Sequence, residues 1–349
     1  MEGLKDERKQ DRPAIVAGID AGMETTKAVV LSGNGRYEWA IVPGGTESTA
    51  RIAQVALDQA AGKAEVSSKS IRNIVATGAG ARLIPWAKGE QVESPCLSRG
   101  INLLLPSART LLDLGARKSL TLRCEAGKVV KTAASGTCAA GTGTYLKMVS
   151  AILGIDQAEA DRLYFRSHAD LEIQSPCAVF AESEIISRVH GGEKIEDILR
   201  GVFRGLAGRI YSQLLDVGIE KDVAAVGGLA RSKAIRSALE EVLHFGLLIP
   251  EVPEIVAALG AALFARDTAR PGGKEVWRER VDGTGRPNPG NTESYSKAPP
   301  RGCPGGDGEP TQARAPAKRV AARRGVRRGD NKDGAKKATR YEKSRGGMS

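Results

Sequence analysis

One short pattern occurs twice in this chain: an apolar run, an aspartate, one further residue and a glycine. The first copy ends in Asp20 and Gly22, and the second ends in Asp113 and Gly115. Apolar runs interrupted by a glycine-containing turn are typical of two strands joined by a tight turn. Two such turns facing one another can bind a triphosphate from both sides. The repeat therefore indicates two turns that act on the same ligand.

The first turn has the composition of a phosphate-binding loop. Gly22 lets backbone N–H groups approach a phosphate. Thr25 and Thr26 add hydroxyl groups, and Lys27 offsets negative charge. Asp20 can hold a hydrated Mg²⁺ ion, which prefers carboxylate and water oxygens. The alternative is an ordinary hairpin turn, which uses the same residue types. The segment does not match the Walker pattern of P-loop proteins.

A third candidate segment is VGGLARS, residues 226–232. Here a short apolar run ends in Gly227 and Gly228, and a helix is predicted to follow. Glycines at this point allow a base or ribose to lie against the backbone, with Arg231 available to the nucleotide. Each of the three segments is a weak signal alone, but their order and separation together indicate a nucleotide site.

Hydrophobic periodicity predicts mixed α/β structure with two lobes and a cleft between them. We expect helices over residues 46–62, 99–110, 144–153, 176–190 and 195–217, then for about a dozen residues after Ser232, and over 253–266. We expect strands over residues 71–77, 119–123, 128–132 and 223–226.

The three segments together resemble the acetate and sugar kinase/Hsc70/actin superfamily, and the resemblance covers residues 14–266. It implies a two-lobed actin-like ATPase fold over residues 14–267, with ATP and Mg²⁺ in the cleft between the lobes. We expect the first lobe at about 14–100, the second at about 101–250, and a closing helix at 253–266. Asp20 and Asp113 are then the candidate catalytic carboxylates.

Two of the five cysteines stand at predicted helix starts. Cys138 precedes the turn Gly141-Thr142-Gly143, and Cys177 follows Ser175 and Pro176, which suit an N-cap and a first helical position. A helix N-terminus favours a thiolate. The alternative is two buried structural thiols. The cysteine spacing does not suggest a disulfide framework, so we expect a cytoplasmic, reduced chain.

The segments CAAGTG and CAVFAESEIIS around these cysteines resemble the BadF/BadG/BcrA/BcrD ATPase family. That family comprises activators of 2-hydroxyacyl-CoA dehydratases and the ATPase subunits of benzoyl-CoA reductases. The resemblance implies that Cys138 and Cys177 hold half of a [4Fe-4S] cluster shared by two subunits. A [4Fe-4S] cluster usually takes four thiolates, which agrees with two from each chain.

The second turn departs from the sequence DIGGQDSK found in most activators. Arg117 and Lys118 stand where that pattern has Gln and Asp. Such residues typically orient the attacking water, so the departure argues against independent ATP hydrolysis. It is similar to the D-type subunit of benzoyl-CoA reductases. It favours a D-like subunit paired with a non-identical ATPase subunit; a homodimeric activator is the alternative.

These features predict an ATP-dependent electron-transfer subunit. Reduced ferredoxin would be the electron donor, and a cluster-containing acyl-CoA reductase or dehydratase would be the acceptor. A different function within the superfamily is an N-acetyl amino-sugar kinase, in which Asp113 would act on a sugar hydroxyl.

The formal charge of +11 belongs to the C-terminal segment. Residues 268–349 contain 20 Lys and Arg against 9 Asp and Glu, whereas residues 1–267 contain 32 of each. The segment is rich in Gly and Pro and poor in large aliphatic residues, so we expect a disordered basic tail. Its basic runs suit nucleic acid or an acidic partner, but few aromatic residues accompany them, so nucleic-acid binding is not expected.

The N-terminal residues 1–13 are expected to be flexible. They are charged and contain no apolar segment of a secretory signal. No run of residues approaches the ~20 apolar positions that a membrane span requires, so no membrane association is expected.

Overall fold

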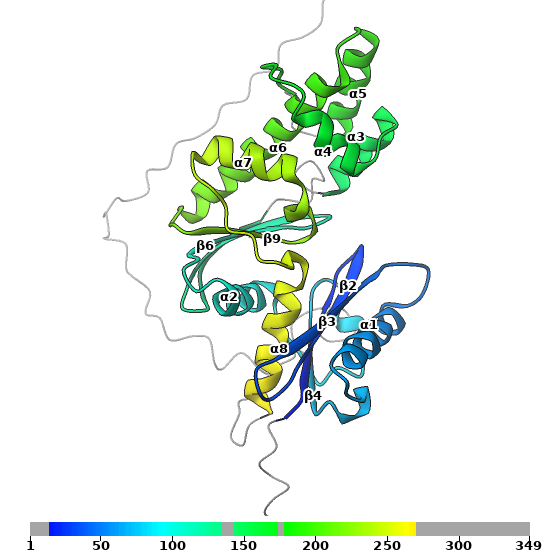
Figure 1. Cartoon of the computed structure of the whole chain (residues 1–349), viewed down its shortest axis with the longest axis vertical. Helices are drawn as coiled ribbons and strands as arrows, with labels where there is room; N and C mark the ends of the chain where they lie inside the picture. Colours follow the sequence, from blue (N-terminus) through cyan, green and yellow to red (C-terminus); the bar gives the residue numbers. More distant parts are fainter. Residues whose placement is uncertain (1–13, 135–142, 174–177, 270–349) are drawn as a thin grey trace, which may run out of the picture. The chain divides into compact units, whose positions relative to one another are not determined.

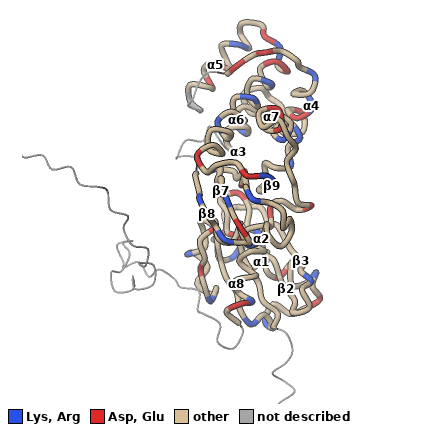
Figure 2. Tube along the Cα trace, turned by 90° about the vertical axis from the view of Figure 1, so that its left-hand side faces the viewer, with Lys and Arg blue, Asp and Glu red and all other residues tan. Residues whose placement is uncertain are grey.

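The structure is a computed structural model that describes residues 14–134, 143–173 and 178–269. These residues form two β-sheets with helices on both faces of each (Figure 1). Figure 2 shows basic and acidic residues interspersed along the described part of the chain. The predicted N-terminal and C-terminal disorder falls on residues outside the described ranges, apart from Thr268 and Ala269.

The first sheet has the strand order β3-β2-β1-β4-β5. Strands β1, β2 and β3 form an antiparallel meander, and β4 and β5 run parallel to β1. The bounds are β1 Val16–Ala21, β2 Thr25–Leu31, β3 Tyr37–Pro43, β4 Asn73–Thr77 and β5 Gly89–Glu90.

The second sheet, β8-β7-β6-β9, repeats the connectivity of the first four strands. Strands β6, β7 and β8 form an antiparallel meander, and β9 lies parallel to β6 as β4 lies parallel to β1. The bounds are β6 Thr110–Leu114, β7 Ser119–Glu125, β8 Lys128–Ala134 and β9 Val223–Val226. The two sheets are therefore related in topology, as the resemblance to the two-lobed ATPase superfamily implies.

Eight α-helices are described: α1 Thr49–Lys63, α2 Glu93–Leu104, α3 Gly143–Leu153, α4 Gln157–Tyr164, α5 Ala178–His190, α6 Ile195–Val217, α7 Lys233–Leu243 and α8 Val256–Thr268. Helix α6 and strand β9 have the predicted bounds. The helix predicted at 99–110 is misplaced, because α2 begins at Glu93 and β6 already starts at Thr110. Pro95 in the first turn of α2 and Pro106 just beyond its end fit the observed bounds. The sequence patterns did not predict α4 or β5.

Helix α8 comes from the end of the described chain but packs on the first sheet (Figure 1). Its residues Ala258 and Leu259 share a buried cluster with Val16 of β1. Helix α1 covers the opposite face of that sheet. The second sheet lies between α2 on one face and α6 with α7 on the other. Each sheet is therefore the middle layer of three.

Helices α2 and α8 approach each other through glycines. A Cβ atom at Gly260 of α8 would lie 1.8 Å from the carbonyl oxygen of Cys96 in α2. One at Gly100 of α2 would lie 2.1 Å from the carbonyl oxygen of Val256. Side chains do not fit at these positions, so glycine sets the distance between the two helices.

None of the described helices combines the length and the apolar character needed to cross a membrane.

Candidate functional site

The two predicted turns have the same backbone hydrogen bond. In the β1–β2 turn the Gly22 N–H donates to the Thr25 carbonyl at 3.1 Å, and in the β6–β7 turn the Gly115 N–H donates to the Lys118 carbonyl at 3.1 Å. In each turn the aspartate stands two residues before the glycine, near the end of the sheet's central strand. The repeated sequence pattern is thus a repeated local structure.

A glycine that follows the neighbouring parallel strand lies against the side chain of each aspartate. Gly78 after β4 has φ +86°, and its Cβ would lie 2.4 Å from Asp20 Oδ1. Gly227 after β9 has φ +85°, and its Cβ would lie 2.7 Å from Asp113 Oδ1. Glycine satisfies both the left-handed backbone and the close approach. The sequence patterns pointed to Gly227 but not to Gly78. Gly78 follows a predicted strand, as Gly227 does, and that shared position was the available signal.

The first aspartate is paired with a cation. Asp20 and Lys27 are directly opposite each other in the β1–β2 ladder, and Lys27 Nζ donates to Asp20 Oδ2 at 3.2 Å. Asp20 is 6% exposed. Burial raises the pKa of its carboxyl group, and the nearby Lys27 opposes that rise. Strand alternation places Thr25 on the same face as Lys27, and Thr26 on the opposite, buried face.

The second aspartate has a different environment. Its cross-strand neighbour is Leu120 rather than a lysine. Burial, followed by repulsion from Glu93 and Asp20, raises the pKa of Asp113 to about 7, although Lys27 and Lys118 act in the opposite direction. The two carboxyl groups therefore have different charged neighbours while standing at equivalent places.

Glu93, the first residue of α2, is a site residue that the sequence analysis missed. Its carboxylate pairs with Lys118 Nζ, and its charge also acts on Asp20, Asp113 and Lys27. These interactions bring three carboxylates and two lysines from both turns into one neighbourhood. The available signal was an acidic residue in the first turn of a helix that leads into the second turn.

The carboxylates fit a hydrated Mg²⁺ ion. Asp20 Oδ1 is buried and has no hydrogen-bond partner among the described residues. Within the described ranges, no group of three or more His, Cys, Asp or Glu side chains stands close enough to hold a metal ion by itself. Mg²⁺ typically uses one or two carboxylates together with water and phosphate oxygens, so this donor set suits it.

The third segment follows β9. The Gly227 N–H donates to the Pro253 carbonyl at 2.9 Å, and residues Gly228–Arg231 form a short 3₁₀ helix. A Cβ at Gly228 would meet no atom within 4 Å, so this backbone faces open space. The Arg231 guanidinium pairs with Glu254. The predicted contact of this segment with a base or ribose stays a prediction.

Helix α3 is attached to the second turn by its first two residues. The Gly143 N–H donates to the Gly115 carbonyl at 3.1 Å, and the Thr144 N–H donates to the Ala116 carbonyl at 2.8 Å. The Thr144 hydroxyl donates to the same Ala116 carbonyl at 2.7 Å. Three hydrogen bonds therefore join the start of α3 to the second turn.

The match to known families decides what this arrangement belongs to. A model of the BadF/BadG/BcrA/BcrD ATPase family matches residues 17–265. The chain belongs to this family. The resemblance drawn from the cysteine segments is confirmed.

Relatives of this ATPase include both kinds of family member. The chain is 33% identical over 263 residues to the 2-hydroxyisocaproyl-CoA dehydratase activator of Clostridioides difficile, covering 74% of this chain and 97% of the activator. It is 29% identical over 262 residues to the D-type subunit of benzoyl-CoA reductase from Thauera aromatica, covering 72% and 92%. A solved structure of the Clostridium difficile activator with bound ADPNP matches with a TM-score of 0.68 and 32% identity, covering 73% of this chain and 95% of that one. The actin-like ATPase fold is confirmed.

Cys138 and Cys177, the predicted cluster ligands of this BadF-type ATPase, lie outside the described residues. The described helices that follow them are α3, beginning five residues after Cys138, and α5, beginning directly after Cys177.

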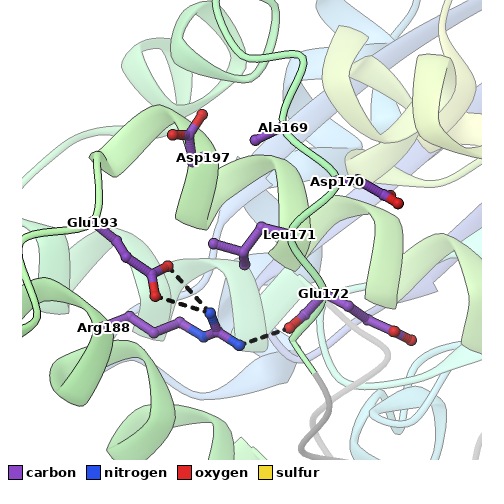
Figure 3. A pocket seen from close by; sticks show the side chains of 7 residues that line it. All are labelled: Ala169, Asp170, Leu171, Glu172, Arg188, Glu193 and Asp197. Atoms are coloured by element: carbon purple, nitrogen blue, oxygen red, sulfur yellow. Dashed lines mark hydrogen bonds and ion pairs between the residues drawn. The ribbon is translucent and has the colours of Figure 1, made fainter.

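Arg188 of α5 joins the elements on either side of the second cysteine. It lines a hollow of about 610 Å³ formed by Ala169, Asp170, Leu171, Glu172, Arg188, Glu193 and Asp197 (Figure 3). Its guanidinium donates to the Glu172 carbonyl at 2.9 Å and to both Glu193 carboxylate oxygens at 3.1 Å. The arginine thus ties the segment before Cys177 to the helix after it.

Proposed function

We propose that this chain is an ATP-dependent electron-transfer subunit that carries half of a [4Fe-4S] cluster shared with a second ATPase subunit. Cys138 and Cys177 would supply two of the four thiolates. The cluster would receive an electron from reduced ferredoxin and deliver it at low potential to an acyl-CoA reductase or dehydratase.

The observation that carries the proposal is the attachment of α3 to the second turn. The helix that follows Cys138 in the sequence is fixed at its start, because three hydrogen bonds hold Gly143 and Thr144 to Gly115 and Ala116. A change of nucleotide at the turn would move this helix. Coupling between ATP and a cysteine-bound group needs such a rigid connection.

Different groups of this chain would bind the phosphates, the Mg²⁺ ion and the nucleoside. The N–H groups of the two turns and Lys27 bind phosphate oxygens, and Asp20 Oδ1 supplies a ligand for Mg²⁺. Mg²⁺, when bound, neutralises charge on the phosphates. Asp113, with a pKa of about 7, is suited to accept and return a proton at neutral pH. Gly227 and Gly228 leave room for the nucleoside.

For the partner, we propose a benzoyl-CoA reductase-type assembly with a non-identical ATPase subunit. Arg117 and Lys118 in the second turn support this choice, since an altered turn is tolerated where another subunit retains the complete one. The second candidate is a homodimeric activator of a 2-hydroxyacyl-CoA dehydratase. The higher identity to an activator, 33% against 29%, favours it.

The cluster is tested by anaerobic purification of the full chain with its co-expressed partner and measurement of iron. We expect iron in the wild-type complex and its loss in Cys138→Ser and in Cys177→Ser. Cys303→Ser is the matched control and should keep the iron. Unchanged iron in the first two variants would reject the proposal.

The partner is tested by the mass of the ATPase complex and by the acceptor it reduces. A heterodimer that supports ATP-dependent reduction of an aromatic acyl-CoA supports the first candidate. A homodimer that activates a dehydratase supports the second. ADP release that depends on an added amino sugar would instead indicate the kinase alternative.

A further inference from the structure

The two turns share a backbone hydrogen bond but differ in the residue that stands opposite the aspartate in the strand ladder. In the first turn the residue opposite Asp20 in the strand ladder is Lys27. In the second turn the residue opposite Asp113 is Leu120, which is 8% exposed. The second turn therefore lacks the lysine that its counterpart has at the equivalent register position.

A lysine stands two residues earlier instead. Lys118 closes the second turn, because its carbonyl accepts the Gly115 N–H. Its ammonium group pairs with Glu93 of α2, the helix that covers the face of the sheet on which Leu120 and Asp113 lie. The charge of Lys118 acts on both aspartates, so its ammonium group belongs to the site even though it comes from a different register position.

Glu93 holds this ammonium group in the structure. The Lys118 side chain is 51% exposed and the Glu93 side chain 18% exposed. Burial alone would lower the pKa of Lys118, but the hydrogen bond to Glu93 and the surrounding carboxylates outweigh it and raise the pKa. Lys118 is thus a charged hydrogen-bond donor, and Glu93 of the same chain is its acceptor.

We propose that Lys118 is the triphosphate-selecting cation of the second turn: it leaves Glu93 and binds the terminal phosphate when ATP occupies the site. This inference rests on the proposed function, since it requires that the two turns bind ATP. A phosphate oxygen competes with the Glu93 carboxylate for the same ammonium group. ADP lacks the terminal phosphate and leaves the Lys118–Glu93 pair in place. Lys118 therefore distinguishes ATP from ADP. Helix α2 is affected as well, because its Glu93 loses the contact with Lys118 only when ATP binds.

The test compares MgATP and MgADP binding to the full chain, by calorimetry, in wild type and variants. A charged hydrogen bond contributes roughly 1.5–3 kcal/mol, which is about a 10- to 150-fold change in affinity. Lys118→Ala should weaken ATP binding by about 10-fold or more and ADP binding by less than about 3-fold. Lys118→Arg should retain most of the ATP affinity. Lys128→Ala, which removes an exposed lysine of β8, is the matched control and should change neither.

Glu93→Gln tests the competition. It removes the charge that holds Lys118, so ATP should bind several-fold tighter than to wild type, and this gain should vanish in the Lys118→Ala background. Equal losses of ATP and ADP affinity in Lys118→Ala, or no loss of either, would overturn the inference while leaving the proposed function standing. A wild-type chain that binds no ATP would overturn both.

Discussion

Asp20 and Asp113 show how one local structure gives two carboxyl groups different chemistry. Both lie near the end of an interior strand of a sheet, both precede the same type of glycine turn, and both have a left-handed glycine against one oxygen. Their cross-strand neighbours differ, Lys27 in one case and Leu120 in the other. A neighbouring cation favours the charged carboxylate and its absence favours the proton.

The raised pKa of Asp113 predicts a pH-dependent stability. Its folded pKa is about 7 against an ordinary 3.8, so between these values the folded protein binds more protons than the unfolded chain. Stability from this group is present below about pH 4 and is lost as pH rises through 7. We expect urea unfolding in EDTA to show a loss on the order of 1–4 kcal/mol between pH 5 and pH 8. Asp113→Asn should flatten that slope; an unchanged slope would contradict the assignment.

Gly227 and Gly228 are adjacent in the third segment, but substitutions at the two positions should differ in their effects on stability and nucleotide affinity. Gly227→Ala brings a Cβ within 2.7 Å of Asp113 Oδ1 in a left-handed backbone, so it should lower both thermal stability, by about 1–3 kcal/mol, and nucleotide affinity. Gly228→Ala adds a methyl group in open space and should change stability by less than about 0.5 kcal/mol. If Gly228→Ala weakens nucleotide binding while stability stays constant, the nucleotide lies against this backbone. Equal stability losses in the two variants would count against the geometry.

At the scale of elements, hydrogen bonds to the β6–β7 turn hold the first turn of α3. Thr144→Val removes the hydroxyl hydrogen bond to Ala116 and keeps the side-chain shape and the backbone bonds. The loss of about 1 kcal/mol should speed amide exchange at the start of α3 roughly five-fold, and ADP and ATP affinities should stay near wild type. Hydrogen exchange with mass detection measures the first effect. Thr144→Ser keeps the donor and should behave like wild type. Equal exchange in Val and Ser variants would show that the hydroxyl does not hold α3.

The crossing of α2 and α8 depends on glycine. Gly260→Ala places a methyl carbon within 1.8 Å of the Cys96 carbonyl, so the helices must separate, at a cost of about 3 kcal/mol or more. Gly62→Ala in α1 is the matched control, because a Cβ there meets no atom within 4 Å. It should be neutral or stabilising by up to ~1 kcal/mol. Thermal unfolding compares the two; similar melting temperatures would contradict the close packing.

At the scale of the whole molecule, local patterns predicted the parts of the fold that local forces determine. Both turns were predicted because the aspartate and glycine spacing sets the turn within a few residues. Helix α6 was predicted with its bounds because its apolar face runs uninterrupted to Gly218. The order of predicted helices and strands indicated two α/β lobes, and the actin-like ATPase fold came from the family resemblance.

What the sequence left open depends on contacts between distant residues. Glu93 becomes a site residue because Lys118, 25 residues later in the sequence, lies beside it in the fold. Gly78 was interpreted as the end of a strand, since its approach to Asp20 requires the parallel pairing of β1 and β4.

The return of α8 to the first sheet has a consequence for biosynthesis. Strand β1 is among the first described elements to leave the ribosome, and α8, which covers one face of its sheet, is the last. Until then Val16, Val29 and Val75 have no helix over them. Exposed apolar surface of this kind is what chaperones recognise and what drives aggregation of nascent chains. The N-terminal half is therefore completed only when translation reaches residues 256–268, and a ribosome stalled before that point would present an unfinished sheet to the cell.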